Sequence, residues 1–134
     1  MKILALDWGE KYIGLALSDQ SEKIAFRRPE VLNNSAFLAY LSQLVQAEKI
    51  EKIILGQPQH LWGEMAEVSQ KVNDFVMTWP LDLQAKLELV DERWTSRMAE
   101  RNQQQWGKKS DHKKRLDSAS AQILLENYLQ RKNK

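Results

Sequence analysis

The chain has 134 residues, a length that predicts one domain over residues 1–134 and argues against an enzyme built from two lobes. Hydrophobic residues make up 43% of the chain and Cys is absent, which excludes disulfide frameworks, thiolate zinc sites and Cys nucleophiles. No apolar run approaches the roughly 20 residues of a membrane span and no secretory leader begins the chain, so we expect a soluble, cytoplasmic protein.

The formal net charge of +2, from 20 basic and 18 acidic residues, is unevenly distributed along the chain. After Ser96 there are ten basic and four acidic residues, a net charge of +6, whereas residues 1–96 carry a net charge of −4. A basic C-terminal part indicates contact with nucleic acid or another polyanion.

The first third of the chain has the pattern of an antiparallel sheet. Residues 3–6 form a short apolar run, typical of a strand buried on both faces, and residues 12–17 form a second one after a short turn. The short spacing predicts a hairpin. A weaker third strand is expected near residues 24–26 or 30–32, where Pro29 suits an edge better than a centre.

Helix and strand patterns alternate over the middle of the chain. Apolar residues at helical spacing over 37–45 predict a helix that Asn34 or Ser35 can cap. Residues 52–55 predict a strand, and the helical stripe over 68–79 ends at Pro80.

The last third begins with residues 87–90, which predict a further strand ending at Asp91. Thr95 or Ser96 can cap a helix that runs to about residue 106. Residues 107–115 are basic and lack apolar periodicity, which predicts a loop, and a final helix is expected over about 116–131.

The order of these elements predicts an α/β protein, a mixed five-stranded sheet with helices on both faces. Strands one, four and five would be parallel. Because ligand sites in such sheets lie beyond the carboxyl ends of the parallel strands, Asp7, the loop after Leu55 and Asp91–Glu92 are expected at one edge.

Three acidic residues are candidates for a catalytic metal site at this edge. Asp7 and Glu92 follow apolar strands directly, and Asp117 opens an apolar stripe of the last helix. Three converging carboxylates are usually held by a hard divalent cation, here Mg²⁺ or Mn²⁺. Such ions can activate water and stabilise the leaving oxyanion in phosphodiester hydrolysis.

Each acid also has an ordinary structural role open to it. Asp7 could start a turn, Glu92 could pair with Arg93 or Arg97 on the surface, and Asp117 could cap the last helix. It is the joint placement of the three that favours a metal site over these separate roles.

Basic residues lead directly into Asp117. These residues could hold a phosphate backbone beside the acids. Alternatively, they could form an ordinary solvent-exposed loop with no binding role. The predicted nucleic-acid contacts are Lys108, Lys109, Lys113, Lys114 and Arg115.

Four segments together resemble the YqgF family, the RuvC-like proteins of ribonuclease-H fold that are named as Holliday junction resolvases or pre-16S rRNA nucleases. The segments are LALDWGEKYIGLALSD at 4–19, ILGQP at 54–58, VDERWTS at 90–96 and DSASAQIL at 117–124. The resemblance implies the ribonuclease-H fold, divalent-metal nuclease chemistry and a role in maturing the 5′ end of 16S rRNA. It also implies that Asp7, Glu92 and Asp117 are the acidic active-site residues.

The chain departs from the family pattern at several positions. Trp8 stands where the family usually has Pro, and Tyr12 stands where it has a basic residue. Residues 59–64 replace an Asn-x-Asp-Gly-Thr-like segment. Trp8 lies at the end of a predicted strand, where it could stack on a base or pack a loop.

These observations lead to one main hypothesis and three alternatives. We expect a metal-dependent phosphodiesterase that acts on structured RNA such as pre-16S rRNA, as a monomer or homodimer. The same chemistry could act on four-way DNA junctions, where a dimer would suit a two-fold substrate. A ribosome-assembly factor that binds nucleic acid without turnover is a further possibility. An actin-like or sugar-kinase ATPase ranks last because it needs two lobes.

Overall fold

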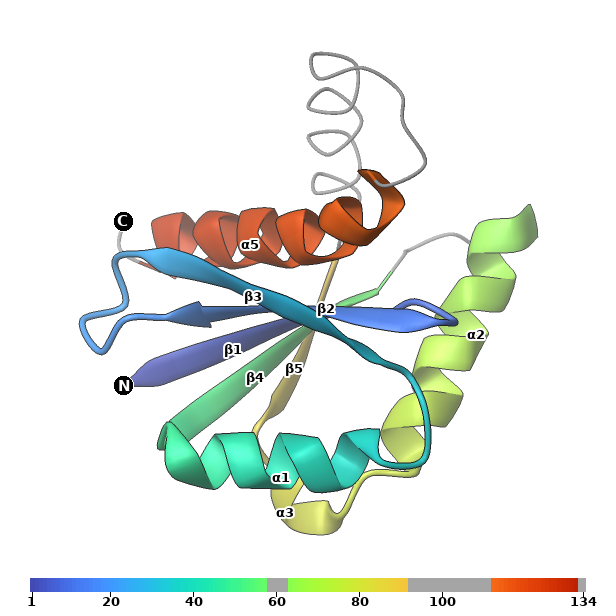
Figure 1. Ribbon diagram of the computed structural model, residues 1–134, viewed down its shortest axis with the longest axis horizontal. Coiled ribbons are helices and arrows are strands. Elements are labelled where there is room, and N and C mark those ends of the chain that lie inside the picture. Colours follow the sequence, from blue (N-terminus) through green and yellow to red (C-terminus); the bar gives the residue numbers. More distant parts are fainter. Residues whose placement is uncertain (58–62, 92–111, 133–134) are drawn as a thin grey trace.

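The computed structural model describes residues 1–57, 63–91 and 112–132, which form a layered α/β arrangement (Figure 1). The elements in chain order are β1 (Lys2–Asp7), β2 (Tyr12–Ser18), β3 (Ala25–Leu32), α1 (Phe37–Ala47), β4 (Ile50–Gln57), α2 (Gly63–Met77), α3 (Leu81–Gln84), β5 (Leu87–Asp91) and α5 (His112–Lys132).

In the described part of the chain, five strands form one mixed sheet with the order β3-β2-β1-β4-β5. β1, β2 and β3 are antiparallel neighbours, whereas β1 pairs with β4, and β4 with β5, in parallel. The predicted sheet and its parallel strands are therefore confirmed. β3 includes both segments proposed for the third strand except Ile24. Pro29 lies in this edge strand, where the ladder with β2 shifts register between Ile13 and Leu15.

Helices cover both faces of the sheet, as predicted. Side chains alternate along each strand, so a continuous apolar run places apolar side chains on both faces. On β1, Leu4 and Leu6 point into a core shared with α1, α2 and α3, whereas Ile3 and Ala5 point into a second core beneath α5. Figure 1 shows α5 and α1 on opposite sides of the strands. Trp79 is buried in the first of these cores, as its place on the helical stripe predicts.

The C-terminal end of α5 lies at the amino end of β1. The Lys132 ammonium is 2.6 Å from a Glu22 carboxylate oxygen, and the Met1 amino group is 3.6 Å from the other oxygen. α5 therefore runs back along the sheet from this end, so that its first half lies toward the carboxyl ends of β1, β4 and β5.

The final helix starts earlier than predicted. The final helix begins at His112 and not near residue 116, so that Lys113, Lys114 and Arg115 belong to its first turns and not to a loop. Lys and Arg are good helix formers. These first turns lack an apolar stripe, so apolar periodicity alone did not predict that they are helical. The helix expected over 95–106 falls outside the described residues.

The short helix α3 was not predicted from the sequence. It forms one turn between Pro80 and Ala85, which is too short to show helical periodicity. The predicted cap of α1 was wrong, since the N-cap is Ala36 without a side-chain cap bond, and the Asn34 side chain instead accepts a hydrogen bond from the Ala36 N–H at 3.0 Å. Among the described residues, no helix has the length and apolar content to cross a bilayer.

Candidate active site

Asp7 ends β1 on the α5-facing side of the sheet. It follows Ile3 and Ala5 in the alternation that points into the core beneath α5. On one side its register partner in β2 is Gly14. On the other side Leu6 pairs with Leu55, so that continuing the register by one residue sets Gly56 of β4 beside Asp7. Both neighbouring positions are glycines, and both are buried.

The carboxyl end of β5 lies at the same edge of the sheet. Gly56 pairs with Val90 and Gln57 pairs with Asp91, so the last residue of β5 is two strands from β1, about 10 Å at the usual strand spacing. Glu92 directly follows Asp91 in the chain and lies outside the described residues. Its place at this edge stays a prediction from the sequence.

Asp117 lies in the first half of α5, four residues before Ala121, which is fully buried against the sheet. The helix rises about 22 Å from Lys132 back to Asp117, and β1 spans about 20 Å from Met1 to Asp7. Because Lys132 and Met1 meet at Glu22, these similar lengths carry the backbone at Asp117 to the end of the sheet where Asp7 lies.

The remaining predicted site residues divide into two groups. Lys108 and Lys109 lie outside the described residues, as does Glu92. The backbone of the other four lies in α5, whereas their side chains are outside the described part; these are Lys113, Lys114, Arg115 and Asp117. Among the side chains that the structure describes, no three His, Asp or Glu residues are grouped as a metal site. The ligand set stays a prediction.

The β1–β2 turn beside Asp7 is fixed by contacts that sequence reasoning missed. The Asn33 side-chain amide donates a hydrogen bond to the Gly9 carbonyl at 2.8 Å, and the Asn33 N–H donates one to the Lys11 carbonyl at 2.9 Å. Glu10 pairs with Lys71 of α2. This hydrogen-bonded pairing lowers the pKa of the Glu10 carboxyl and raises the pKa of the Lys71 ammonium.

Trp8 packs against the core on the α1 side of the sheet. Of the two roles open to it from the sequence, the structure supports packing. Trp8 follows Leu4 and Leu6 in the alternation along β1, which points it away from the face that Asp7 shares with α5.

Gly9→Ala is expected to destabilise the fold by about 1–3 kcal/mol, the usual cost of overpacking. A Cβ at Gly9 would lie 2.5 Å from the backbone carbonyl oxygen of Tyr12, and a backbone atom cannot move aside as a flexible side chain can. Urea unfolding measures the difference. Lys11→Ala at the same turn is the control, expected to change stability by no more than about 0.5 kcal/mol; equal stability of Gly9→Ala and wild type would show that the turn relaxes freely.

Comparison with known proteins assigns the chain to a family. Residues 1–131 match the model of the family described as "RuvX: Holliday junction resolvase". The chain belongs to the RuvX family. This confirms the resemblance to YqgF proteins that the four sequence segments indicate.

Three relatives of this RuvX-family chain share the name "Putative pre-16S rRNA nuclease". The protein of Flavobacterium psychrophilum is 33% identical, over 98% of this chain and 98% of the relative. That of Maridesulfovibrio salexigens is 35% identical, over 98% and 99%. That of Sulfurihydrogenibium sp. is 36% identical, over 97% and 90%. The similarity between this chain and each relative therefore extends over 90% or more of both proteins.

Proposed function

We propose that this protein is a metal-dependent nuclease that hydrolyses phosphodiester bonds in the maturation of the 5′ end of pre-16S rRNA. The observation that carries the proposal is the position of Asp7, at the carboxyl end of a central parallel strand with a glycine on either side. β5 ends at Asp91 at this edge, and the backbone of α5 runs toward it from Lys132. The RuvX family assignment and the names of the relatives support the same activity.

The three acidic residues proposed for this edge have the chemistry of a site for a hard divalent cation. Asp7, Glu92 and Asp117 offer only carboxylate oxygens, the ligands that Mg²⁺ and Mn²⁺ prefer. Asp7 itself is partly buried at the end of β1, on the α5-facing side of the sheet. When bound, such an ion would supply Lewis-acid stabilisation of charge on the phosphate and its leaving oxygen.

The protein's own residues have two roles in this proposal. Asp7, fixed at the end of a buried strand, holds one carboxylate in place without a flexible loop, which keeps the geometry ready for the substrate. The basic residues before Asp117 hold the phosphate backbone. Three of them belong to the first turns of α5, where the positive end of the helix dipole adds to their attraction for phosphate.

Cleavage of a precursor 16S RNA is expected to require Mg²⁺ or Mn²⁺. A chelator should abolish product formation, and adding back either metal should restore it. Carboxylates alone cannot stabilise the negative charge that develops on the phosphate oxygens. Gel analysis of end-labelled RNA measures the rate. Equal cleavage with and without the metal would contradict metal-dependent hydrolysis.

The family description also favours a second substrate, the four-way DNA junction. Direct competition between labelled precursor RNA and an unlabelled junction at one stated salt concentration separates the two, since charge-driven binding alone is not specific. We expect the RNA to be cleaved in preference. Preferential cutting of the junction would assign the activity to branched DNA, and firm RNA binding with no cleavage of either would assign a non-catalytic assembly role.

A further inference from the structure

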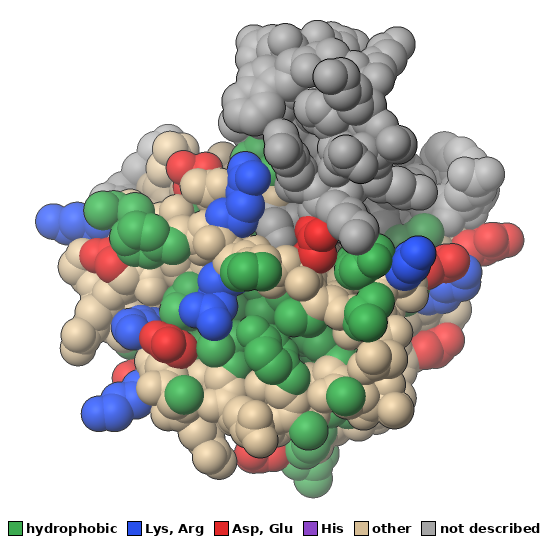
Figure 2. Space-filling view, viewed as in Figure 1, with side chains coloured by type: hydrophobic (Ala, Val, Ile, Leu, Met, Phe, Trp, Pro, Cys, Tyr) green, Lys and Arg blue, Asp and Glu red, His purple; other side chains and the backbone are tan. Residues whose placement is uncertain are grey.

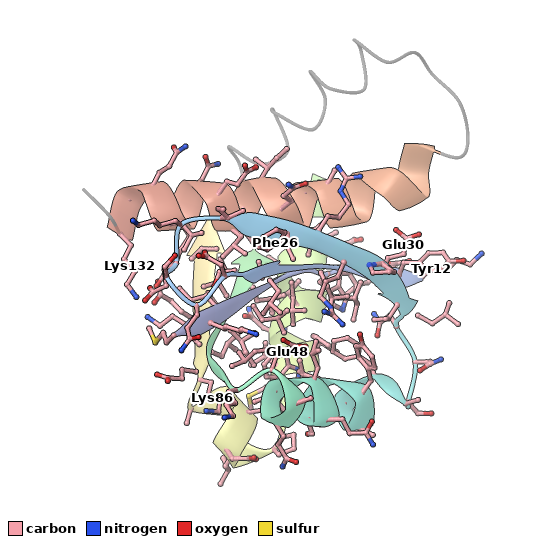
Figure 3. All side chains as sticks on the ribbon, turned by 60° about the vertical axis from the view of Figure 1, so that its left-hand side comes forward. Tyr12, Phe26, Glu30, Glu48, Lys86 and Lys132 are labelled. Atoms are coloured by element: carbon pink, nitrogen blue, oxygen red, sulfur yellow. The ribbon has the colours of Figure 1, made fainter. Side chains whose placement is uncertain are left out.

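An aromatic ring and an ammonium group lie on the sheet next to Asp7. Tyr12 begins β2, two residues before Gly14, the register partner of Asp7. Residues two apart on a strand share a face, so Tyr12 lies on the α5-facing side with Asp7. The position between them is Gly14, which places no side chain there. Figure 3 shows Tyr12 at the end of the sheet away from Lys132.

Lys11 adds a positive charge to this position. Its ammonium nitrogen lies 5.6 Å from the centroid of the Tyr12 ring, within the range of a cation–π contact. The Tyr12 side chain is partly buried and Lys11 is exposed. A ring and a cation together suit a nucleotide, since the ring can stack on a base and the ammonium can contact a phosphate.

The turn that carries Lys11 and Tyr12 is held from two sides. Asn33 bonds to the carbonyls of Gly9 and Lys11, and the Glu10–Lys71 pair joins the turn to α2. A ring on a fixed backbone loses less conformational entropy on binding than one on a flexible loop. Stacking there would therefore contribute to affinity with little ordering cost.

We propose that Tyr12 stacks on an unpaired nucleobase next to the phosphate held at Asp7, with Lys11 on the backbone of the same nucleotide. The inference rests on the proposed function, which places the scissile phosphate at Asp7. Bases within a duplex already stack on one another, so this contact selects RNA with an unpaired nucleotide at the cleavage site. It disfavours a substrate that is fully paired there.

The test uses the full chain in an Asp7→Asn background, so that binding can be measured without cleavage. Fluorescence anisotropy at one salt concentration compares an RNA hairpin that has a single-stranded 5′ overhang with the same hairpin made blunt. Tyr12→Ala should weaken overhang binding about tenfold, the usual value of one base stack. Tyr12→Phe keeps the ring and should stay within about twofold of its parent.

Two further variants are controls. Phe26→Ala removes an aromatic side chain, 54% exposed, from the opposite face of neighbouring β3, and should leave binding unchanged. Tyr12→Leu keeps apolar bulk without a π-face and should weaken overhang binding as Tyr12→Ala does, which maintains the comparison if Tyr12→Ala does not fold. The blunt hairpin should bind all variants equally.

Three results would overturn the inference. They are unchanged overhang binding in Tyr12→Leu, an equal loss on overhang and blunt RNA, and a loss in Tyr12→Phe as large as in Tyr12→Leu. Cleavage by the chain with Asp7 intact is measured separately with Mn²⁺. No cleavage there would overturn the nuclease proposal alone, since the binding comparison decides the role of Tyr12 without turnover.

Discussion

Asp7→Asn is expected to slow cleavage of precursor 16S RNA by about 10³-fold while the protein stays folded. The substitution keeps the size of the side chain and removes the negative charge that would help hold a divalent cation, an interaction worth several kcal/mol in the transition state. Asp7 is the last residue of β1 and is only partly buried, unlike the four fully buried residues before it. Single-turnover kinetics with saturating Mg²⁺ measure the rate, and circular dichroism checks the fold.

Asp82→Asn is the matched control for this experiment. Asp82 is an exposed carboxylate in α3, which precedes β5 and therefore lies toward the amino ends of the parallel strands. It should cleave at the wild-type rate. Wild-type cleavage by Asp7→Asn would remove Asp7 from the active site, and an equal loss in both variants would indicate a general effect of charge.

Leu125→Ala is expected to lower the free energy of unfolding by about 3 kcal/mol, within the range for a leucine truncated in a core. Leu125 is fully buried, in the cluster where α5 meets Ile3 of β1 and Ile54 of β4. The truncation leaves a cavity between the helix and the sheet. Urea unfolding followed by circular dichroism measures the change.

The adjacent residue provides the control for Leu125→Ala. Glu126 is exposed on the outer side of α5, so Glu126→Gln should change stability by no more than about 0.5 kcal/mol. Because α5 carries Asp117, Leu125→Ala should also cleave more slowly than Glu126→Gln at a temperature where both are folded. Equal stability of the two variants would show that α5 does not depend on this core.

α5 is also fixed to the sheet by a polar contact that is independent of the core. The Lys52 ammonium donates hydrogen bonds to the Tyr128 hydroxyl and to Glu88, both at 3.0 Å. The bond to Tyr128, followed by that to Glu88, raises the pKa of Lys52. This contact joins α5 to β4 and β5 near the amino ends of the strands, and the helix is thereby oriented along the sheet.

Much of the fold could be predicted because its strands are buried. Residues 3–6 and 52–55 are apolar runs between turn residues, the pattern of buried strands. The connection between the first two strands is short, which predicts a hairpin. The start of α5 could not be predicted, because its first turns are basic and show no apolar stripe. α3 was missed because one turn has no period to detect.

The candidate site could be predicted in outline but not in its supporting contacts. Asp7 follows from the rule that ligands bind beyond the carboxyl ends of parallel strands. The Asn33 bonds to the β1–β2 turn depend on the register of β2 and β3, and the Glu10–Lys71 pair joins residues 61 positions apart. Asn33 and Lys71 lie outside the four family segments, so only the fold brings them to the β1–β2 turn.

Titration of Mn²⁺ by calorimetry, into wild type and three single variants, tests most directly whether Asp7, Glu92 and Asp117 form one metal site. The variants are Asp7→Asn, Glu92→Gln and Asp117→Asn. Removal of any one carboxylate from a shared site should weaken Mn²⁺ binding by about tenfold or more. Tenfold corresponds to a loss of roughly 1.4 kcal/mol of binding free energy. Wild-type affinity in any one of the three would contradict the convergence of these carboxylates on a single ion.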